Sequence, residues 1–291
     1  MLARRRRPVK RRPAEARRRQ AQTGPRAAEA AGCPYHRAMA TDIPHPILLV
    51  TGGSRGIGAA CSLQAAAAGW DVAVNYTRDA AAAERVAEGV RARGRRAIVV
   101  QADVGDEAQV LAMFARVDAE FGRLSGLVNN AGVVDVPARV DQMDLRRLRR
   151  MFDTNILGSV LCAREAVRRM STRHGGSGGS IVNLSSAAVR LGSPSQYVAY
   201  AASKGAIDAF TLGLGREVAA EGIRVNAVRP GIIDTDIHAS GGLPDRARDM
   251  APQVPMRRAG SADECAAAVL WLLSNASSYT TGAVVDVTGG R

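Results

Sequence analysis

The sequence predicts an α/β fold, a doubly wound parallel sheet of about seven strands in a single domain. From His45 onward, short apolar and β-branched runs alternate with longer amphipathic, alanine-rich stretches, as in repeated βαβ units. The runs at 47–50 and 97–100 are apolar throughout, which is typical of strands covered on both faces. A glycine-rich turn follows the first of these runs, as expected at the ligand edge of such a sheet.

Short apolar segments are expected to form the strands, with helices in the spaces between them. The strands are expected at residues 47–50, 71–76, 97–101, 126–129, 180–184, 224–228 and 283–287. Ligands are expected beyond the carboxyl ends of these strands. The Gly/Ser-rich run at 174–179 is expected to be a surface connection.

The net charge of +13 over 291 residues is concentrated at one end of the chain. Residues 1–40 contain eleven arginines and Lys10 against Glu15 and Glu29, a net of +10. The other 251 residues carry 28 basic and 25 acidic side chains, a net of +3. We therefore expect residues 41–291 to form the domain, and their charge does not indicate a nucleic-acid or membrane partner.

The basic segment 1–40 has no apolar periodicity and contains four prolines, so we expect it to be disordered. It could act as a cationic arm on nucleic-acid phosphates, although it is poor in aromatic side chains that stack on bases. Alternatively it is not translated, because Met39 offers a natural start for the fold. Organelle targeting fits less well, since serines are few and prolines many.

The cysteines Cys33, Cys61, Cys162 and Cys265 are widely spaced and form no ligand-like cluster with the four histidines. Neither a disulfide framework nor a metal site is expected, and a cytoplasmic location fits this composition. No apolar run reaches the roughly 20 residues that span a bilayer. The basic start is not followed by the apolar segment of a secretory signal.

Gly52, Gly56 and Gly58 form the candidate dinucleotide site between the first strand and an alanine-rich helix. Glycines there let the backbone approach a pyrophosphate, which binds the free N–H groups and the positive dipole of the helix N-terminus. Such a trio also occurs in turns that bind nothing. The strand before it and the helix after it favour a Rossmann-type site.

The end of the second expected strand indicates which nicotinamide cofactor is used. An NAD enzyme places an acidic residue there, whereas this chain reads Asn75-Tyr76-Thr77-Arg78. Arg55 and Arg78 could pair with the 2′-phosphate of NADP(H). Alternatively both are solvated surface arginines. We expect NADP(H) to be preferred and NAD(H) to be possible.

Tyr200 and Lys204 have i, i+4 spacing, which places the phenol and the ammonium on one face of a helix. The chain has 38 arginines and two lysines, and Lys204 is the only lysine after residue 40. A lysine is a compact cation that can approach a ribose and a phenolate together. The alternative is a surface pair without function.

The energetics of an acid/base tyrosine require more than an exposed pair. Bringing its pKa from about 10 to neutrality needs roughly 4 kcal/mol of preferential phenolate stabilisation. An exposed i, i+4 pair supplies a few tenths of a kcal/mol, whereas a cation at about 4 Å in an effective dielectric near 20 supplies about 4 kcal/mol. Tyr200 therefore needs a partly enclosed cleft with an oxidised nicotinamide nearby.

Ser185 and Ser186 follow the expected strand at 180–184, at the ligand edge of the sheet. Ser186 could hold a substrate oxygen and the developing oxyanion while Tyr200 transfers the proton. Alternatively both are loop serines, an interpretation that Tyr200 downstream makes less attractive.

Together these residues resemble the short-chain dehydrogenase/reductase family. The resemblance spans residues 46–291 and depends on motifs in the family's order and spacing: Thr51-Gly-Gly-Ser-Arg-Gly-Ile-Gly58, Ala102-Asp-Val104, Asn129-Asn-Ala-Gly132, Ser186, Tyr200-x-x-x-Lys204 and Arg229-Pro-Gly231. Thirteen residues separate Ser186 from Tyr200, one more than is usual in the family. It is therefore open whether Ser185 or Ser186 faces the substrate.

The resemblance implies an enzyme that transfers hydride between a nicotinamide and a carbonyl or secondary alcohol. It implies that Tyr200 is the catalytic acid/base and Lys204 its activator and a ligand of the nicotinamide ribose. Ser186 resembles the residue that orients the substrate. Asn155 matches an asparagine that kinks a helix and holds a water between Lys204 and solvent. Alternatively it is a core asparagine with a satisfied amide.

The resemblance also implies where the cofactor binds, from the glycine-rich turn through an adenine pocket to a wall beside the nicotinamide. The implied ligands are Gly52, Ser54, Arg55, Gly56, Ile57, Gly58, Thr77, Arg78, Asp103, Val104, Asn129, Ala131, Gly132, Tyr200, Lys204, Pro230, Gly231, Ile233 and Thr235.

Similar members are called glucose or ribitol dehydrogenases or 3-oxoacyl-carrier-protein reductases, which does not define the substrate. A small-molecule pocket is expected from residues 187–198 and 237–256, the latter resembling a mobile lid. The family implies a homotetramer formed through the helices near 155–170 and 200–221 and the C-terminal strand. A non-catalytic, cofactor-sensing relative is the remaining alternative, disfavoured because all four catalytic positions are filled.

Overall fold

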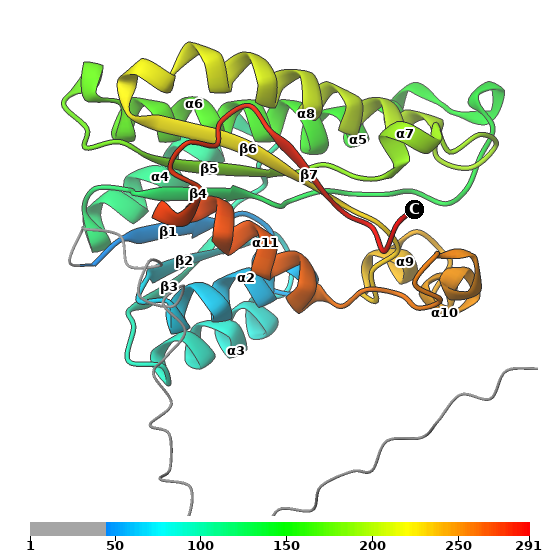
Figure 1. The fold of residues 1–291 in the computed structure, drawn as a ribbon, viewed down its shortest axis with the longest axis horizontal. Coiled ribbons are helices and arrows are strands. Elements are labelled where there is room, and N and C mark those ends of the chain that lie inside the picture. Colours follow the sequence, from blue (N-terminus) through cyan, green and yellow to red (C-terminus); the bar gives the residue numbers. More distant parts are fainter. Residues whose placement is uncertain (1–44) are drawn as a thin grey trace, which may run out of the picture. The chain divides into compact units, whose positions relative to one another are not determined.

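Seven parallel strands form one sheet in the computed structural model, which describes residues 45–291. The strand order is β3-β2-β1-β4-β5-β6-β7, so the chain winds outward in both directions from β1 and β4 (Figure 1). The strands are β1 (Ile47–Val50), β2 (Asp71–Tyr76), β3 (Ala97–Gln101), β4 (Gly126–Asn129), β5 (Gly179–Leu184), β6 (Ile223–Pro230) and β7 (Val284–Val287). The predicted doubly wound sheet is confirmed, with boundaries within two residues of those expected. The basic segment 1–40, with its expected disorder and alternative start at Met39, lies outside the described residues.

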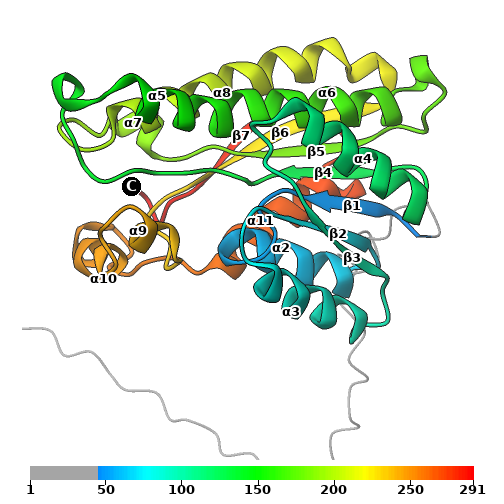
Figure 2. The ribbon, with the colours of Figure 1, turned by 180° about the vertical axis from the view of Figure 1, so that it is seen from behind.

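Helices cover both faces of the sheet (Figures 1 and 2). On one face lie α2 (Gly56–Ala67), α3 (Ala80–Arg91) and α11 (Ala262–Leu273), and on the other α4 (Glu107–Phe121), α5 (Leu145–Phe152), α6 (Gly158–Met170) and α8 (Val198–Glu217). Side chains of β1 alternate between the two cores, because successive residues of a strand point to opposite faces. Leu48 and Val50 enter the core with α2 and α11, whereas Ile47 and Leu49 enter the core with α4 and α6.

The segments that follow β5 and β6 form short helices beyond the carboxyl ends of these strands. They are α7 (Ala188–Leu191), α9 (Ile237–Ser240) and α10 (Arg246–Met250), and Figure 1 shows α9 and α10 together. Between α5 and α6 the chain makes one wide π-helical turn at Asp153–Leu157. Single π turns of this kind are frequent at functional sites.

The structure shows the environment of three cysteines and the character of the helices. Cys61, Cys162 and Cys265 are free, and burial raises the pKa of each thiol. Of the helices in residues 45–291, none is both long and apolar enough to cross a membrane.

Candidate active site

The glycine-rich turn is held by side chains from the ends of the two strands that flank β1. Gly52 has a φ of +60°, a left-handed conformation that favours glycine. Its N–H donates to Asn75 Oδ1 (3.0 Å), and its carbonyl accepts from Asn130 Nδ2 (2.9 Å). Asn130 Nδ2 also donates to the Thr51 carbonyl (2.9 Å). The ends of β2 and β4 thereby fix the shape of the turn.

The start of α2 fits a dinucleotide pyrophosphate. A Cβ at Gly58 would lie 2.5 Å from the Gly52 carbonyl oxygen and 2.6 Å from Asn130 Nδ2, so a side chain there would displace the turn. The first turn of α2 has no side-chain cap and no acidic residue. Its N–H groups are therefore left for an anion, which the helix dipole also favours. Gly56 is the first residue of α2, and the expected ligands Ser54 and Ile57 lie next to it in the chain.

The end of β2 has no acidic side chain that could exclude a 2′-phosphate. Arg55 and Arg78 are exposed, and neither guanidinium forms a hydrogen bond or an ion pair with another described residue. Thr77, also exposed, uses its carbonyl to accept from Gln101. Asp79 is committed to the N-terminus of α3, where it accepts from the N–H of Ala82 (2.8 Å). Both arginines are therefore free to bind an anion.

The residues expected at the adenine pocket, Asp103 and Val104, and at the adenosine-ribose edge, Asn129, divide into exposed and buried ones. Asp103 is exposed and accepts from the Gly105 N–H (2.9 Å). Val104 is 4% exposed and belongs to the core. Asn129 is also buried, and its amide donates to the Ser159 carbonyl and to Asn183 Oδ1. Any contact of Val104 or Asn129 with a cofactor would therefore come from the backbone.

Tyr200 and Lys204 lie on the same side of α8 and line one cavity. Lys204 is 5% exposed, and its Nζ lies 5.8 Å from the centre of the Tyr200 ring. The Nζ donates to the Leu184 carbonyl (2.7 Å), the last residue of β5. Burial lowers the pKa of Lys204 to about 8, and the charge of Asp208 opposes this change. The ammonium is thus held at the end of β5, near the phenol.

Ser186, not Ser185, contacts the phenol. Ser186 shares a side-chain hydrogen bond with Tyr200, and its Oγ accepts from the Ala188 N–H (3.1 Å). Ser185 is buried, and its hydroxyl donates to the Lys204 carbonyl (3.4 Å). Burial raises the pKa of Tyr200, and the hydrogen bond with Ser186 opposes this. The chain by itself therefore favours a protonated Tyr200, and a phenolate needs further positive charge nearby.

The extra residue between Ser186 and Tyr200 is accommodated in the turn between α7 and α8. Ser193 and Ser195 have φ values of 48° and 60° there, although neither is glycine. A left-handed conformation is uncommon for such residues and costs energy. The surplus length is thus taken up ahead of Tyr200 without moving Ser186 away from the phenol.

Asn155 lies in the π turn and is fully buried. Its Oδ1 accepts from the Val133 N–H (2.8 Å), and its Nδ2 donates to the Val133 carbonyl (2.9 Å) and to Ser203 Oγ (3.1 Å). The amide is therefore satisfied by protein partners, as in the alternative of a core asparagine. A Cβ at Gly132 would lie 3.4 Å from Asn155 Oδ1 and 3.5 Å from Lys204 Nζ, so Gly132 separates the two groups.

One cavity of about 580 Å³ joins the cofactor side to the substrate side of the site. The expected wall residues Pro230, Gly231, Ile233 and Thr235 line it, together with Ile57 and Gly132. Thr235 reaches the glycine-rich turn, because a Cβ at Gly56 would lie 3.4 Å from its side chain. Both segments expected to form the substrate pocket contribute to the lining.

Several functional residues were missed by sequence reasoning. Thr51, Asn75 and Asn130 hold the glycine-rich turn and the backbone at Ala131, whose N–H donates to Thr51 Oγ1 (3.0 Å). Each is a polar residue at or just after the end of an apolar strand, and that position was the available signal. Arg246 and Arg291 line the cavity as well, and no local pattern distinguishes them among 38 arginines.

The chain is similar to known oxidoreductases over most of its length. A family model described as Enoyl-(Acyl carrier protein) reductase matches residues 52–291. The chain is 53% identical over 245 residues to the "Uncharacterized oxidoreductase YgfF" of Escherichia coli, covering 84% of this chain and 99% of that protein. It is 38% identical over 245 residues to the 3-oxoacyl-[acyl-carrier-protein] reductase FabG of Staphylococcus aureus, covering 83% and 96%.

A solved structure is similar over the same region. It is a short chain dehydrogenase from Burkholderia cenocepacia in complex with NADP, with a TM-score of 0.77 and 34% identity over 84% of this chain and 97% of that one. The fold and the site define a nicotinamide-dependent oxidoreductase acting on CH–OH or carbonyl groups. The chain belongs to the short-chain dehydrogenase/reductase family.

Proposed function

We propose that this enzyme uses NADP(H) to interconvert a small-molecule carbonyl and its secondary alcohol, with Tyr200 as the general acid and base. The observation that carries this proposal is the meeting of Ser186, Tyr200 and Lys204 in one cavity, which continues to the glycine-rich turn. These groups come from the end of β5 and from α8.

Each of these residues has a distinct task in the proposed reaction. When bound, the nicotinamide supplies or accepts the hydride. Ser186 holds the substrate oxygen beside the phenol. In reduction the Tyr200 hydroxyl donates its proton to that oxygen, and in oxidation the phenolate removes the proton. Lys204 supplies the positive charge that favours the phenolate. Asn155 acts as a positioning residue, since it holds Val133 and Ser203 around Lys204.

The preference for NADP(H) is supported by Arg55 and Arg78, which have exposed guanidinium groups without partners in the described chain. Guanidinium groups suit a 2′-phosphate. The test is a comparison of kcat/KM with NADPH and NADH on a panel of sugars, ketones, quinones and β-ketoacyl thioesters. NADPH is expected to be at least about tenfold better, and equal or better efficiency with NADH would contradict the preference.

The cytoplasmic homotetramer implied by the family resemblance stays a prediction. Apolar side chains are exposed at the surfaces expected to associate: Leu212 of α8 is 42% exposed, and Tyr279, just before β7, is fully exposed. Light scattering of the purified protein is expected to give about four times the chain mass of 30.6 kDa.

A further inference from the structure

The substrate side of the cavity is lined by basic residues without acidic ones. Arg246 of α10 and Arg291 line the cavity together with Lys204 and His238. No aspartate or glutamate of the described chain is among its lining residues. This wall is therefore suited to an anion, because no described aspartate or glutamate side chain lines the cavity to offset its positive charges.

Arg291 has unused hydrogen-bonding capacity at this wall. Its Nη1 is buried and has no hydrogen-bond partner within residues 45–291. Both burial and the nearby charge of Arg246 lower the pKa of Arg291. A partly buried guanidinium that lies near a second cation is less favourable than one paired with an anion. A bound anion would satisfy Nη1 and offset the repulsion between the two cations.

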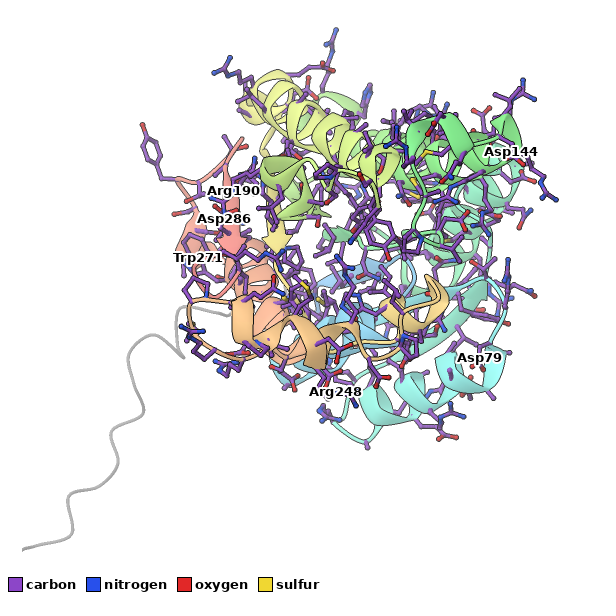
Figure 3. The ribbon with its side chains drawn as sticks, turned by 90° about the vertical axis from the view of Figure 1, so that its right-hand side faces the viewer. Asp79, Asp144, Arg190, Arg248, Trp271 and Asp286 are labelled. Carbon is purple, nitrogen blue, oxygen red and sulfur yellow. The ribbon has the colours of Figure 1, made fainter. Side chains whose placement is uncertain are left out.

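Both arginines are oriented by neighbours. Arg246 Nη1 donates to Gln196 Oε1 (3.1 Å), and its guanidinium lies 5.0 Å from the centre of the Tyr197 ring. The carbonyl of Arg291 accepts from Arg190, which also pairs with Asp286 (3.0 Å); Figure 3 shows Arg190 and Asp286 side by side. The Arg246 side chain is thus pre-organised, which reduces the entropy lost on binding, and the main chain of Arg291 is held beside the cavity.

Arg248, on the same helix as Arg246, shows what an ordinary surface arginine does here. Its side chain is 75% exposed and pairs with Asp245 (3.1 Å) and Asp249 (3.3 Å). Figure 3 places Arg248 at the outer surface of the molecule. Arg246 and Arg291 differ from it because no described carboxylate pairs with either of them.

We propose that the substrate carries an anionic group, a carboxylate or a phosphate, which Arg291 and Arg246 bind while its carbonyl or alcohol lies at Ser186 and Tyr200. This inference rests on the proposed function and names the substrate class for the same site. The two arginines select the substrate and do not take part in proton or hydride transfer. Neutral alcohols and unmodified sugars are therefore expected to be poor substrates.

The first test compares charged and neutral forms of one ketone in the purified full-length enzyme with NADPH. The pairs are 4-oxocyclohexanecarboxylate and its methyl ester, 5-oxohexanoate and its methyl ester, and dihydroxyacetone phosphate and dihydroxyacetone. Within at least one pair, kcat/KM is expected to be tenfold or more higher for the anion. The carboxylate and phosphate arms distinguish the two sources of the charge. Neutral forms that are as good as or better than every anion would overturn the inference while leaving the proposed function intact.

Variants then assign the selectivity to the arginines. The selectivity is the kcat/KM of the anionic substrate divided by that of its neutral form. Arg291→Met is expected to reduce this ratio about tenfold, by raising the KM of the anion rather than by lowering kcat. Arg291→Lys should retain part of the ratio, and Arg246→Gln provides a second, independent variant. The control is Arg248→Ala, which removes a charge from the same helix and should leave the ratio unchanged. An unchanged ratio in both Arg291→Met and Arg246→Gln overturns the inference.

A binding measurement decides the matter if none of these ketones is reduced. Calorimetric titration of the NADP⁺-loaded protein with cyclohexanecarboxylate, cyclohexanol and inorganic phosphate needs no turnover. Tighter binding of an anion than of cyclohexanol, weakened about tenfold by Arg291→Met, supports the inference. Equal binding, or no binding of either anion, overturns it.

Discussion

The cofactor side and the substrate side of the cleft are built in different ways. On the cofactor side, polar side chains form hydrogen bonds with the chain's own backbone. Asn75 and Asn130 both bind Gly52 in this way. On the substrate side, Arg291 keeps a buried donor without a partner, and Ser193 and Ser195 hold an uncommon backbone conformation. The shape of the cofactor turn is therefore fixed by the chain's own hydrogen bonds, whereas the substrate side keeps a buried donor that only a ligand could satisfy.

The largest effect is expected where the two sides meet, at Tyr200. Tyr200→Phe should lower kcat by a factor of about 10² to 10⁴, because the ring remains but the transferable proton is lost. NADPH affinity should change little, since the glycine-rich turn is untouched. Steady-state kinetics and fluorescence titration with NADPH measure the two effects separately.

Tyr197→Phe is the matched control for that substitution. Tyr197 lines the same cavity, and the phenylalanine would keep the ring that lies beside Arg246. Its kcat should stay within about tenfold of the parent enzyme, since no proton transfer is assigned to it. An active Tyr200→Phe enzyme would refute the acid/base role.

The next largest effect should fall on the cofactor side alone. Gly58→Ala places a Cβ 2.5 Å from the Gly52 carbonyl oxygen, so the turn must move. Overpacking of this kind costs about 1 to 3 kcal/mol, which corresponds to a roughly fivefold to 150-fold higher Kd for NADPH. Gly213→Ala in α8 is the control, because nothing lies within 4 Å of its added Cβ. A normal Kd in Gly58→Ala would mean that the turn is not as rigid as inferred.

A smaller effect is expected from the arginines at the edge of the cofactor side. Replacing both Arg55 and Arg78 by alanine should reduce the NADPH over NADH preference about tenfold, because a charge-assisted contact to the 2′-phosphate is lost. Arg216→Ala, which removes an exposed arginine from α8, should have no effect. Ratios of kcat/KM measure the preference. A parallel loss with both cofactors would show that these arginines support the fold rather than read the phosphate.

The smallest expected effect is a shift of pH dependence. Burial lowers the pKa of Lys204 to about 8 and Asp208 opposes this, so Asp208→Asn should lower that pKa further. The alkaline limb of the kcat/KM profile should then begin at lower pH. Asp208 also pairs with Arg229 (2.8 Å), so circular dichroism should first confirm the fold. A limb that stays in place or moves to higher pH contradicts the assignment of Lys204.

The lowered pKa of Lys204 also makes the free energy of unfolding depend on pH. An unfolded lysine has a pKa of about 10.4, so the unfolded chain binds more protons than the native one between pH 8 and that value. The free energy of unfolding contributed by Lys204 therefore rises with pH through this window. In Asp208→Asn the window should open at lower pH, as urea unfolding at several pH values would show.

The sheet and the position of the glycine-rich turn could be predicted because their signals are local. Apolar runs mark the strands, and glycines at fixed spacing follow β1. The direction in which a side chain points was harder to predict, since it depends on packing. Asn129 and Val104 point into the core. The choice between Ser185 and Ser186 depended on how the following loop folds. Arg246 and Arg291 line the same cavity from distant segments of the sequence, an arrangement that has no local signature.

The scarcity of lysine makes the reacting centre directly observable. Lysine labelled with ¹⁵N would contribute two side-chain ammonium groups to a magnetic resonance spectrum, those of Lys10 and Lys204. The arginines stay protonated throughout the accessible range, and burial brings the pKa of Lys204 to about 8. The resonance of Lys204 should therefore report the charge state of one atom in the unmodified enzyme, and follow how each added compound changes it.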